Sequence, residues 1–230
     1  MRPLLLALSA SLVCATPAAA MDEDLTFYMV RGEIDAAHAD GEDIINWDGE
    51  GWIGGPVNRF WFKTEGEIEG GETHAAEVQA LWSRNVADFW DLQAGVRFDF
   101  EPDQRTYLAL GVQGLAPYQF ETEATAFLSE DGDVSARLRQ SLDVHLTQRF
   151  IAEPHGELEA FAQDDPGRMI GAGLADLEIG LQLRYEITRK FAPYVDLVWG
   201  RALGETASLR RAAGESVERS SLRAGIRFWF

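Results

Sequence analysis

The chain has 230 residues, and its 38 Asp and Glu outnumber its 20 Lys and Arg, giving a formal net charge of −18 at pH 7. This excess of acid repels nucleic acid and excludes it as a partner, and it suits cations such as metal ions, although long solvated loops would give the same excess. The one cysteine, Cys14, precedes the mature chain defined below, so we expect no disulfide there.

Residues 1–20 have the pattern of an export signal. Arg2 provides a positive start, Leu4 to Val13 form an apolar run, and Ala18, Ala19 and Ala20 form a small-residue cleavage site. The apolar run is shorter than the roughly 20 residues that a membrane helix needs. We therefore predict a cleaved signal peptide and a mature chain of residues 21–230, with 19 basic against 38 acidic residues once Arg2 is removed.

The mature chain consists of short alternating apolar and polar runs, separated by Gly, Pro, Asp and Asn, which predicts an all-β fold. We expect about twelve strands, an even number that allows closure: Leu25 to Asp35, Ile44 to Ile53, Arg59 to Glu69, Thr73 to Arg84, Trp90 to Phe100, Arg105 to Leu115, Tyr118 to Leu128, Val134 to Gln148, Glu157 to Ala162, Leu177 to Ile187, Tyr194 to Trp199 and Val217 to Phe230.

The alternation is most regular from Asn58 to Phe100. In its last strand, one face carries Leu92, Ala94, Val96, Phe98 and Phe100, and the other carries Asp91, Gln93, Gly95, Arg97 and Asp99. The last strand of the chain alternates in the same way and ends on the aromatic Phe230, as in bacterial outer-membrane proteins. Because an arginine on a lipid-facing surface costs about 2–4 kcal/mol near the midplane, Arg223 and Arg227 should face inward.

The connections predict two different rims. Those after odd-numbered strands carry charged and glycine-rich segments, which we expect to be mobile loops: Ala36 to Asp43, Gly70 to Glu72, Asp164 to Gly171 and Gly204 to Glu215. Those after even-numbered strands are mostly tight, such as Ala116-Pro117 and Thr188 to Pro193. Short periplasmic turns and long outer loops are typical of an outer-membrane barrel.

Aromatic residues are predicted to form two lipid-facing girdles, as expected of a barrel in a membrane. Near the turns we place Trp52, Phe60, Trp82, Phe89, Tyr118, Phe120, Phe191, Phe228 and Phe230; near the loops we place Phe98, Phe100, Tyr107, Phe127, Phe161 and Trp199. Together these patterns predict a transmembrane, antiparallel, up-and-down β-barrel in the outer membrane, a monomer in contact with outer-membrane lipid.

The inward polar faces hold the candidate metal ligands. His145 and Asp143 share a face at a spacing of two, and imidazole with carboxylate suits Cu(II), Zn or Ni. His74 lies at a loop edge and Met169 in a loop, and the same central stretch places Glu65, Glu67 and Glu77 in the lumen. The alternative is that these charges form ion-pair ladders that fill the lumen.

Catalysis is not expected. Ser141 and His145 share a face at a spacing of four, which separates them by about 13 Å along a strand, too far for a hydrogen bond. No GxSxG or other nucleophile motif is present.

Several motifs resemble the copper resistance protein B family, over about residues 47–230: Arg59 to Glu67 (RFWFKTEGE), Ala76 to Arg84 (AEVQALWSR), Phe89 to Asp99 (FWDLQAGVRFD), Gly111 to Tyr118 (GVQGLAPY), Leu146 to Arg149 (LTQR) and Leu183 to Tyr194 (LRYEITRKFAPY). The resemblance implies an outer-membrane barrel that binds copper ions or assists their export or sequestration, together with periplasmic copper-handling proteins.

Members of that family often carry a Met- and His-rich segment before the barrel. Here the first predicted strand follows Ala20 almost at once, and Met21 is the only soft ligand between them. If copper binds tightly, we expect the barrel or a separate periplasmic protein to supply the ligands. The alternative functions are a general small-ion pore and a structural barrel without metal preference; a lipid-modifying barrel enzyme would require a lipid-facing Ser/His pair.

Overall fold

The protein was analysed as a computed structural model, which describes residues 26–39 and 41–230; the predicted signal peptide lies outside them. The strands of the barrel are β1 (Phe27–Ala39), β2 (Glu42–Gly54), β3 (Asn58–Glu69), β4 (Glu72–Ala87), β5 (Trp90–Glu101), β6 (Arg105–Ala116), β7 (Phe120–Ser129), β8 (Val134–Ser141), β9 (Val144–His145), β10 (Phe150–Phe161), β11 (Gly173–Tyr185), β12 (Phe191–Ala202) and β13 (Glu218–Trp229). Two 3₁₀ turns, η1 (Pro117–Gln119) and η2 (Pro166–Arg168), and one helix, α1 (Gly204–Ala213), complete the described elements.

The strands form a closed antiparallel barrel. Each strand pairs with its neighbours in sequence, except that β8 and β9 both pair with β10 and not with each other. Because β13 pairs with β1, the sheet has no free edge at the chain ends. The closure is completed by Val30 and Phe230, whose backbone N–H groups each donate to the other's carbonyl oxygen at 3.1 and 2.9 Å. Because β8 and β9 both pair with β10 as two parts of one strand position, the barrel has twelve strand positions, as predicted.

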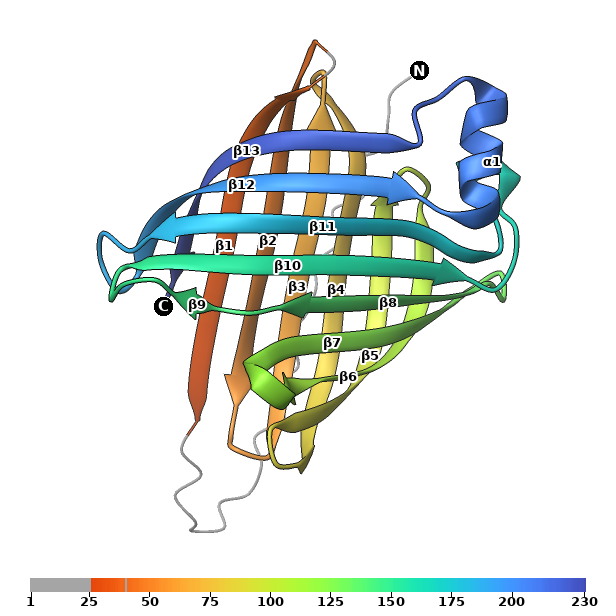
Figure 1. Cartoon of the computed structure of the whole chain (residues 1–230). Helices are drawn as coiled ribbons and strands as arrows, with labels where there is room; N and C mark the ends of the chain where they lie inside the picture. The colour runs from red at the N-terminus through yellow and green to blue at the C-terminus, as the bar shows by residue number, and fades with distance from the viewer. Residues whose placement is uncertain (1–25, 40) are drawn as a thin grey trace, which may run out of the picture.

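The barrel is strongly sheared, and its two sides cross. In Figure 1, β1 to β4 run steeply behind β10 to β13, which run almost at right angles to them. The side chains follow the predicted alternation: Leu92, Val96 and Phe100 are exposed on the outside, whereas Gln93 and Asp99 are 2% exposed inside. An apolar exterior around a polar interior is the reverse of a water-soluble fold and suits a lipid environment.

An apolar cluster fills one part of the interior. It consists of Trp61, Leu81, Tyr107, Ala109 and Phe127 from β3, β4, β6 and β7, with Trp52 packed against it. Trp52, Tyr107 and Phe127 were predicted to belong to the lipid-facing girdles. This prediction was wrong, because their strand positions point inward. Several other predicted girdle residues are exposed: Phe60, Trp82, Phe89, Phe100, Tyr118, Phe191 and Phe230.

Several predicted boundaries were also wrong. The expected loop from Ala36 to Asp43 is mostly strand, and the eighth predicted strand is interrupted at Leu142 and Asp143 between β8 and β9. Gly70 and Gly71 form a two-residue turn, and the segment from Gly204 contains the helix α1. The two longest described connections, residues 162–172 and 203–217, both lie on the rim predicted to carry the loops. No helix in the described part of the chain is long and apolar enough to cross a membrane.

Candidate functional site

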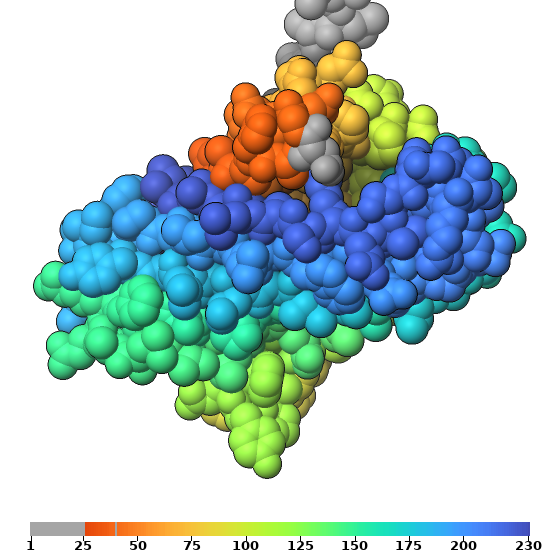
Figure 2. Space-filling model, turned by 45° about the horizontal axis from the view of Figure 1, so that its top comes forward, coloured from red at the N-terminus to blue at the C-terminus, as the bar shows by residue number. Residues whose placement is uncertain are grey.

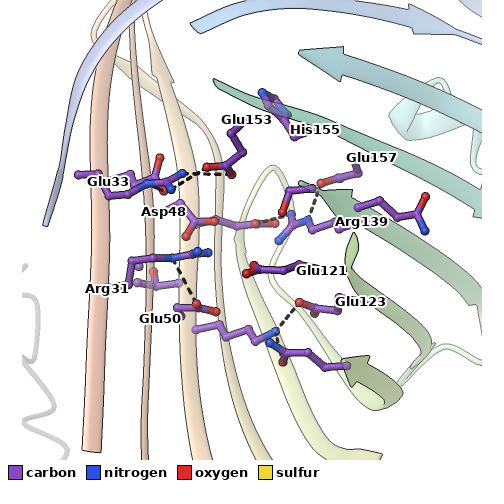
Figure 3. Close-up of a pocket in the computed structure, with 18 of the residues that line it drawn as sticks. Arg31, Glu33, Asp48, Glu50, Glu121, Glu123, Arg139, Glu153, His155 and Glu157 are labelled. Atoms are coloured by element: carbon purple, nitrogen blue, oxygen red, sulfur yellow. Dashed lines mark hydrogen bonds and ion pairs between the residues drawn. The ribbon is translucent and has the colours of Figure 1, made fainter. Parts of the chain in front are cut away.

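The main cavity of the barrel has a volume of about 980 Å³ and is lined mainly by charged and polar side chains. Its wall includes 14 acidic side chains and 6 Lys or Arg side chains, a clear excess of negative charge. Figure 2 shows the hollow that opens between the orange ends of β1 and β2, the yellow strands and the blue β13. In Figure 3, side chains from β1 and β2 project toward those from β7, β8 and β10 across the cavity.

The first two strands contribute a charged wall that the sequence interpretation missed. Arg31 and Glu33 lie on the inner face of β1, and Asp48 and Glu50 on the inner face of β2. Arg31 Nε lies 3.2 Å from Glu50 Oε1. The signal was present in β1, because polar Arg31 and Glu33 alternate there with apolar or small neighbours. Both residues lie within the predicted strand from Leu25 to Asp35, but they were not assigned to the lumen.

Arginine and lysine side chains join strands across the interior. Arg139 of β8 binds Glu65 of β3 at 2.5 Å and Glu157 of β10 at 2.5 Å. Lys63 of β3 reaches Glu123 of β7 at 2.6 Å. Arg139 and Glu157 are register partners on paired strands, whereas β3 is not a neighbour of β7 or β8, so the pairs to Glu65 and Glu123 cross the cavity.

A second group of ion pairs is centred on Glu153 of β10. Its carboxylate binds Arg227 of β13 at 2.7 Å and also Arg184 of β11. Arg227 in turn binds Glu33 of β1 at 2.6 Å. The chain of contacts therefore ties β10 and β11 to the strands at which the barrel closes. Arg227 faces inward, as the cost of arginine in lipid predicted.

Some acidic side chains of the cavity have no basic partner within the described residues. Asp48 and Glu121 make none of the ion pairs found there, and neither carboxylate takes part in a side-chain hydrogen bond found there. Asp35 accepts hydrogen bonds from Asn46 and Tyr194, both neutral groups. The ion-pair ladders therefore neutralise the cavity only in part.

The three predicted glutamate ligands line the cavity and contact arginine. Glu65 is bound by Arg139 and Arg137, and Glu77 lies 2.7 Å from Arg97 and 3.2 Å from Arg137. Glu67 is 3.8 Å from Arg219 at its closest. The lumen thus brings Glu65 and Glu77 together around one arginine, Arg137.

The other predicted ligands lie apart from one another. Asp143 sits at the break between β8 and β9 and pairs with Arg184, whereas His145 is exposed in β9. His74 is exposed near the start of β4. Met169 follows η2 with a left-handed backbone, φ 54°, in the connection before β11. None of these four side chains is among those that line the cavity.

One imidazole does line the cavity, and the sequence interpretation did not select it. His155 Nε2 of β10 lies 3.0 and 3.1 Å from the two carboxylate oxygens of Asp196 in β12. Its side chain reaches over β11 at Gly180, where an added Cβ would lie 2.3 Å from the ring. The sequence separation of 41 residues gave no spacing signal for this pair.

The cavity can therefore attract cations, with oxygen ligands in excess and one imidazole. Among the described residues, no group of three or more His, Cys, Asp and Glu side chains could hold a metal ion.

Solved outer-membrane proteins share this fold. The chain resembles the NanC porin with a TM-score of 0.56 and 14% identity, covering 88% of this chain and 99% of that one. It resembles the KdgM porin with a TM-score of 0.51 and 12% identity, with the same coverage. At these identities the likeness concerns the fold alone.

The sequence comparisons are more specific. Copper resistance protein B of Escherichia coli is 43% identical over 210 residues, which is 91% of this chain and 71% of that protein. The Copper resistance protein B homolog of Pseudomonas syringae pv. tomato (strain ATCC BAA-871 / DC3000) is 42% identical over the same coverage. The family described as Copper resistance protein B precursor (CopB) matches residues 26–230. The chain therefore belongs to the copper resistance protein B family.

Proposed function

We propose that this barrel lies in the outer membrane and provides an acidic path on which copper ions bind and pass, lowering the copper load of the cell. The observation that carries the proposal is the cavity wall, with 14 acidic against 6 basic side chains. Its negative potential raises the local concentration of cations. The relatives of this chain are named for copper resistance, which supports copper as the cation.

In this proposal the protein is exported by its signal peptide and acts as a monomer with no enzymatic activity. Periplasmic copper-handling proteins exchange the ion with it at the rim that carries the short turns. Of the ligands predicted from the sequence, Glu65, Glu67 and Glu77 contribute to the luminal potential. His74, His145, Asp143 and Met169 contribute, if they bind copper, near the ends of strands and in connections rather than in the cavity.

The test is deletion of the gene with complementation by the intact chain. We expect the deletion strain to grow less well in copper and to change its cell-associated copper, and the complemented strain to recover. Growth in zinc and nickel, measured in parallel, reports metal preference. Unchanged growth and unchanged cellular copper would remove the copper role.

A general cation pore is the second candidate, favoured by the volume of the cavity. Planar-bilayer recordings separate the two functions. A large conductance that copper neither blocks nor alters favours the general pore. A decrease in the potassium current on addition of micromolar Cu(II) favours a path on which copper binds.

A further inference from the structure

Within residues 26–39 and 41–230, the pair formed by His155 and Asp196 is the one place where an imidazole meets a carboxylate on the cavity wall. Asp196 is 5% exposed, and the side chain of His155 is 24% exposed, so the pair is accessible from the cavity rather than sealed off. Asp196 also has no Lys or Arg within ion-pair distance among the described residues, unlike most carboxylates of the cavity.

The spacing of the pair is close to that of two adjacent ligands of a planar metal site. Ligand atoms at about 2.0 Å from a metal and at right angles lie about 2.8–2.9 Å apart. The distances from His155 Nε2 to the Asp196 oxygens are 3.0 and 3.1 Å. A metal ion can therefore replace the shared proton with a small adjustment of the side chains, and the proton leaves to solvent.

A third group beside the pair has an unused acceptor. Gln182 of β11 is the register partner of Asp196 and is 4% exposed. Its Nε2 donates to Glu33 at 3.1 Å, whereas its Oε1 is buried and has no hydrogen-bond donor. A buried acceptor without a donor is costly in a protein interior, and a cation bound beside it would satisfy it.

The backbone leaves room for the imidazole to lie in this position. His155 pairs in register with Gly180, and a Cβ at Gly180 would come within 2.3 Å of the imidazole ring. The glycine thus allows the ring to reach from β10 to β12 across the strand between them. Any side chain at this position would displace the ring from Asp196.

We propose that His155 and Asp196, with the amide oxygen of Gln182, form a Cu(II)-binding site on the wall of the cavity. The site uses one nitrogen and two oxygen ligands from the protein, and water completes the coordination. Nitrogen and oxygen ligands in a planar arrangement favour Cu(II) over Mg²⁺ or Ca²⁺. This inference rests on the proposed passage of copper and adds the point in the lumen at which the ion is held.

The test measures Cu(II) binding by the refolded full-length barrel, using electron paramagnetic resonance and a titration. We expect the unaltered barrel to bind one Cu(II) with nitrogen hyperfine coupling. His155→Gln should remove the nitrogen coupling and weaken binding by more than about tenfold, and Asp196→Asn should weaken it similarly. Gly180→Ala should do the same while every ligand residue is kept.

The matched controls are the other histidines. His38 forms a similar pair with Asp43 at 2.8 Å, but both side chains are largely exposed. His38→Gln, His74→Gln and His145→Gln should retain the nitrogen coupling and the affinity. Folding of each variant is checked by the shift of its band on an unheated gel, and three independent variants keep the test decisive if one fails to fold.

Two outcomes would overturn the inference. One is a barrel that shows no nitrogen-coupled Cu(II), and the other is an unchanged signal in both His155→Gln and Gly180→Ala. A lower thermal stability of these variants with unchanged Cu(II) binding would mean that the pair only holds β10 to β12. Copper tolerance of the deletion strain tests the proposed function separately, so the two failures are distinguishable.

Discussion

Arg137 Nη1 of β8 lies 2.5 Å from Glu65 Oε1 of β3, a contact between strands that are far apart in the sheet. The same guanidinium reaches Glu77 of β4 and Glu159 of β10 at 3.2 and 2.9 Å. Its Cζ atom also lies 5.8 Å from the ring centre of Phe127. One arginine thus neutralises carboxylates from three strands and caps the apolar cluster.

Removal of this arginine should destabilise the barrel. Arg137→Ala leaves the carboxylates of Glu65, Glu77 and Glu159 without one of their positive partners. Loss of one partner of a buried pair costs about 3–5 kcal/mol. Urea unfolding of the barrel in lipid vesicles would measure this loss. Arg201→Ala, which breaks the exposed pair with Glu218, should cost less than about 1 kcal/mol, and equal losses would contradict the argument.

The apolar cluster should contribute as much to the free energy of unfolding as the ion pairs of Arg137. Leu81 is 1% exposed and packs with Trp61, Tyr107 and Phe127. Leu81→Ala should therefore lower the free energy of unfolding by about 2–5 kcal/mol, because it leaves a cavity that the rigid sheet cannot close. The control is Leu110→Ala on the exposed outside, where lipid can fill the vacated space. The same measurement should show a smaller loss of unfolding free energy for Leu110→Ala than for Leu81→Ala.

The helix α1 is held to the barrel rim by the hydroxyl group of Thr206 and by an ion pair between Arg210 and Asp176 of β11 at 3.2 Å. Thr206 is 0% exposed, and its Oγ1 accepts a hydrogen bond from the Gly171 N–H at 2.9 Å. Thr206→Val keeps the shape but leaves that N–H without its acceptor, at a cost of about 1–3 kcal/mol. We expect faster trypsin cleavage after Arg210 and Arg211 in this helix. Ser208→Ala, at an exposed position on the same helix, should not change the rate.

Much of the barrel was predictable because a strand has only two faces. The inward positions of Gln93, Arg97 and Asp99 follow from strict alternation along β5, and this inference needs no knowledge of contacts with distant strands. The alternation does not distinguish an aromatic residue in lipid from one in the interior when both lie near a rim. Tyr107 and Phe127 were misassigned because proximity to a rim was used in place of their inward phase.

The candidate site was less predictable because its contacts join distant strands. His145 and Asp143 were linked by spacing along one strand, but a break after β8 and an ion pair with Arg184 separate them. His155 meets Asp196 only because the barrel places β10 two strands from β12 and a glycine lies between. Such a pair depends on the register of two strand pairings, which the pattern of one strand does not contain.

The unpaired carboxylates of the cavity should set its ion preference. Asp48 and Glu121 lie on opposite sides of the cavity, on β2 and β7, and neither makes an ion pair among the described residues (Figure 3). Fixed charge on the wall of a narrow path selects ions of the opposite sign. Asp48→Asn combined with Glu121→Gln should therefore lower the preference for potassium over chloride, measured as a smaller reversal potential across a salt gradient in a planar bilayer.

The matched control removes the same charge elsewhere. Asp103 and Glu215 are exposed and lie outside the cavity, so Asp103→Asn combined with Glu215→Gln should leave the reversal potential unchanged. The shift in the luminal variant should shrink at high salt, because mobile ions screen the wall within about 3 Å at 1 M. A barrel that passes no current, or equal reversal potentials in the two double variants, would contradict a path controlled by Asp48 and Glu121.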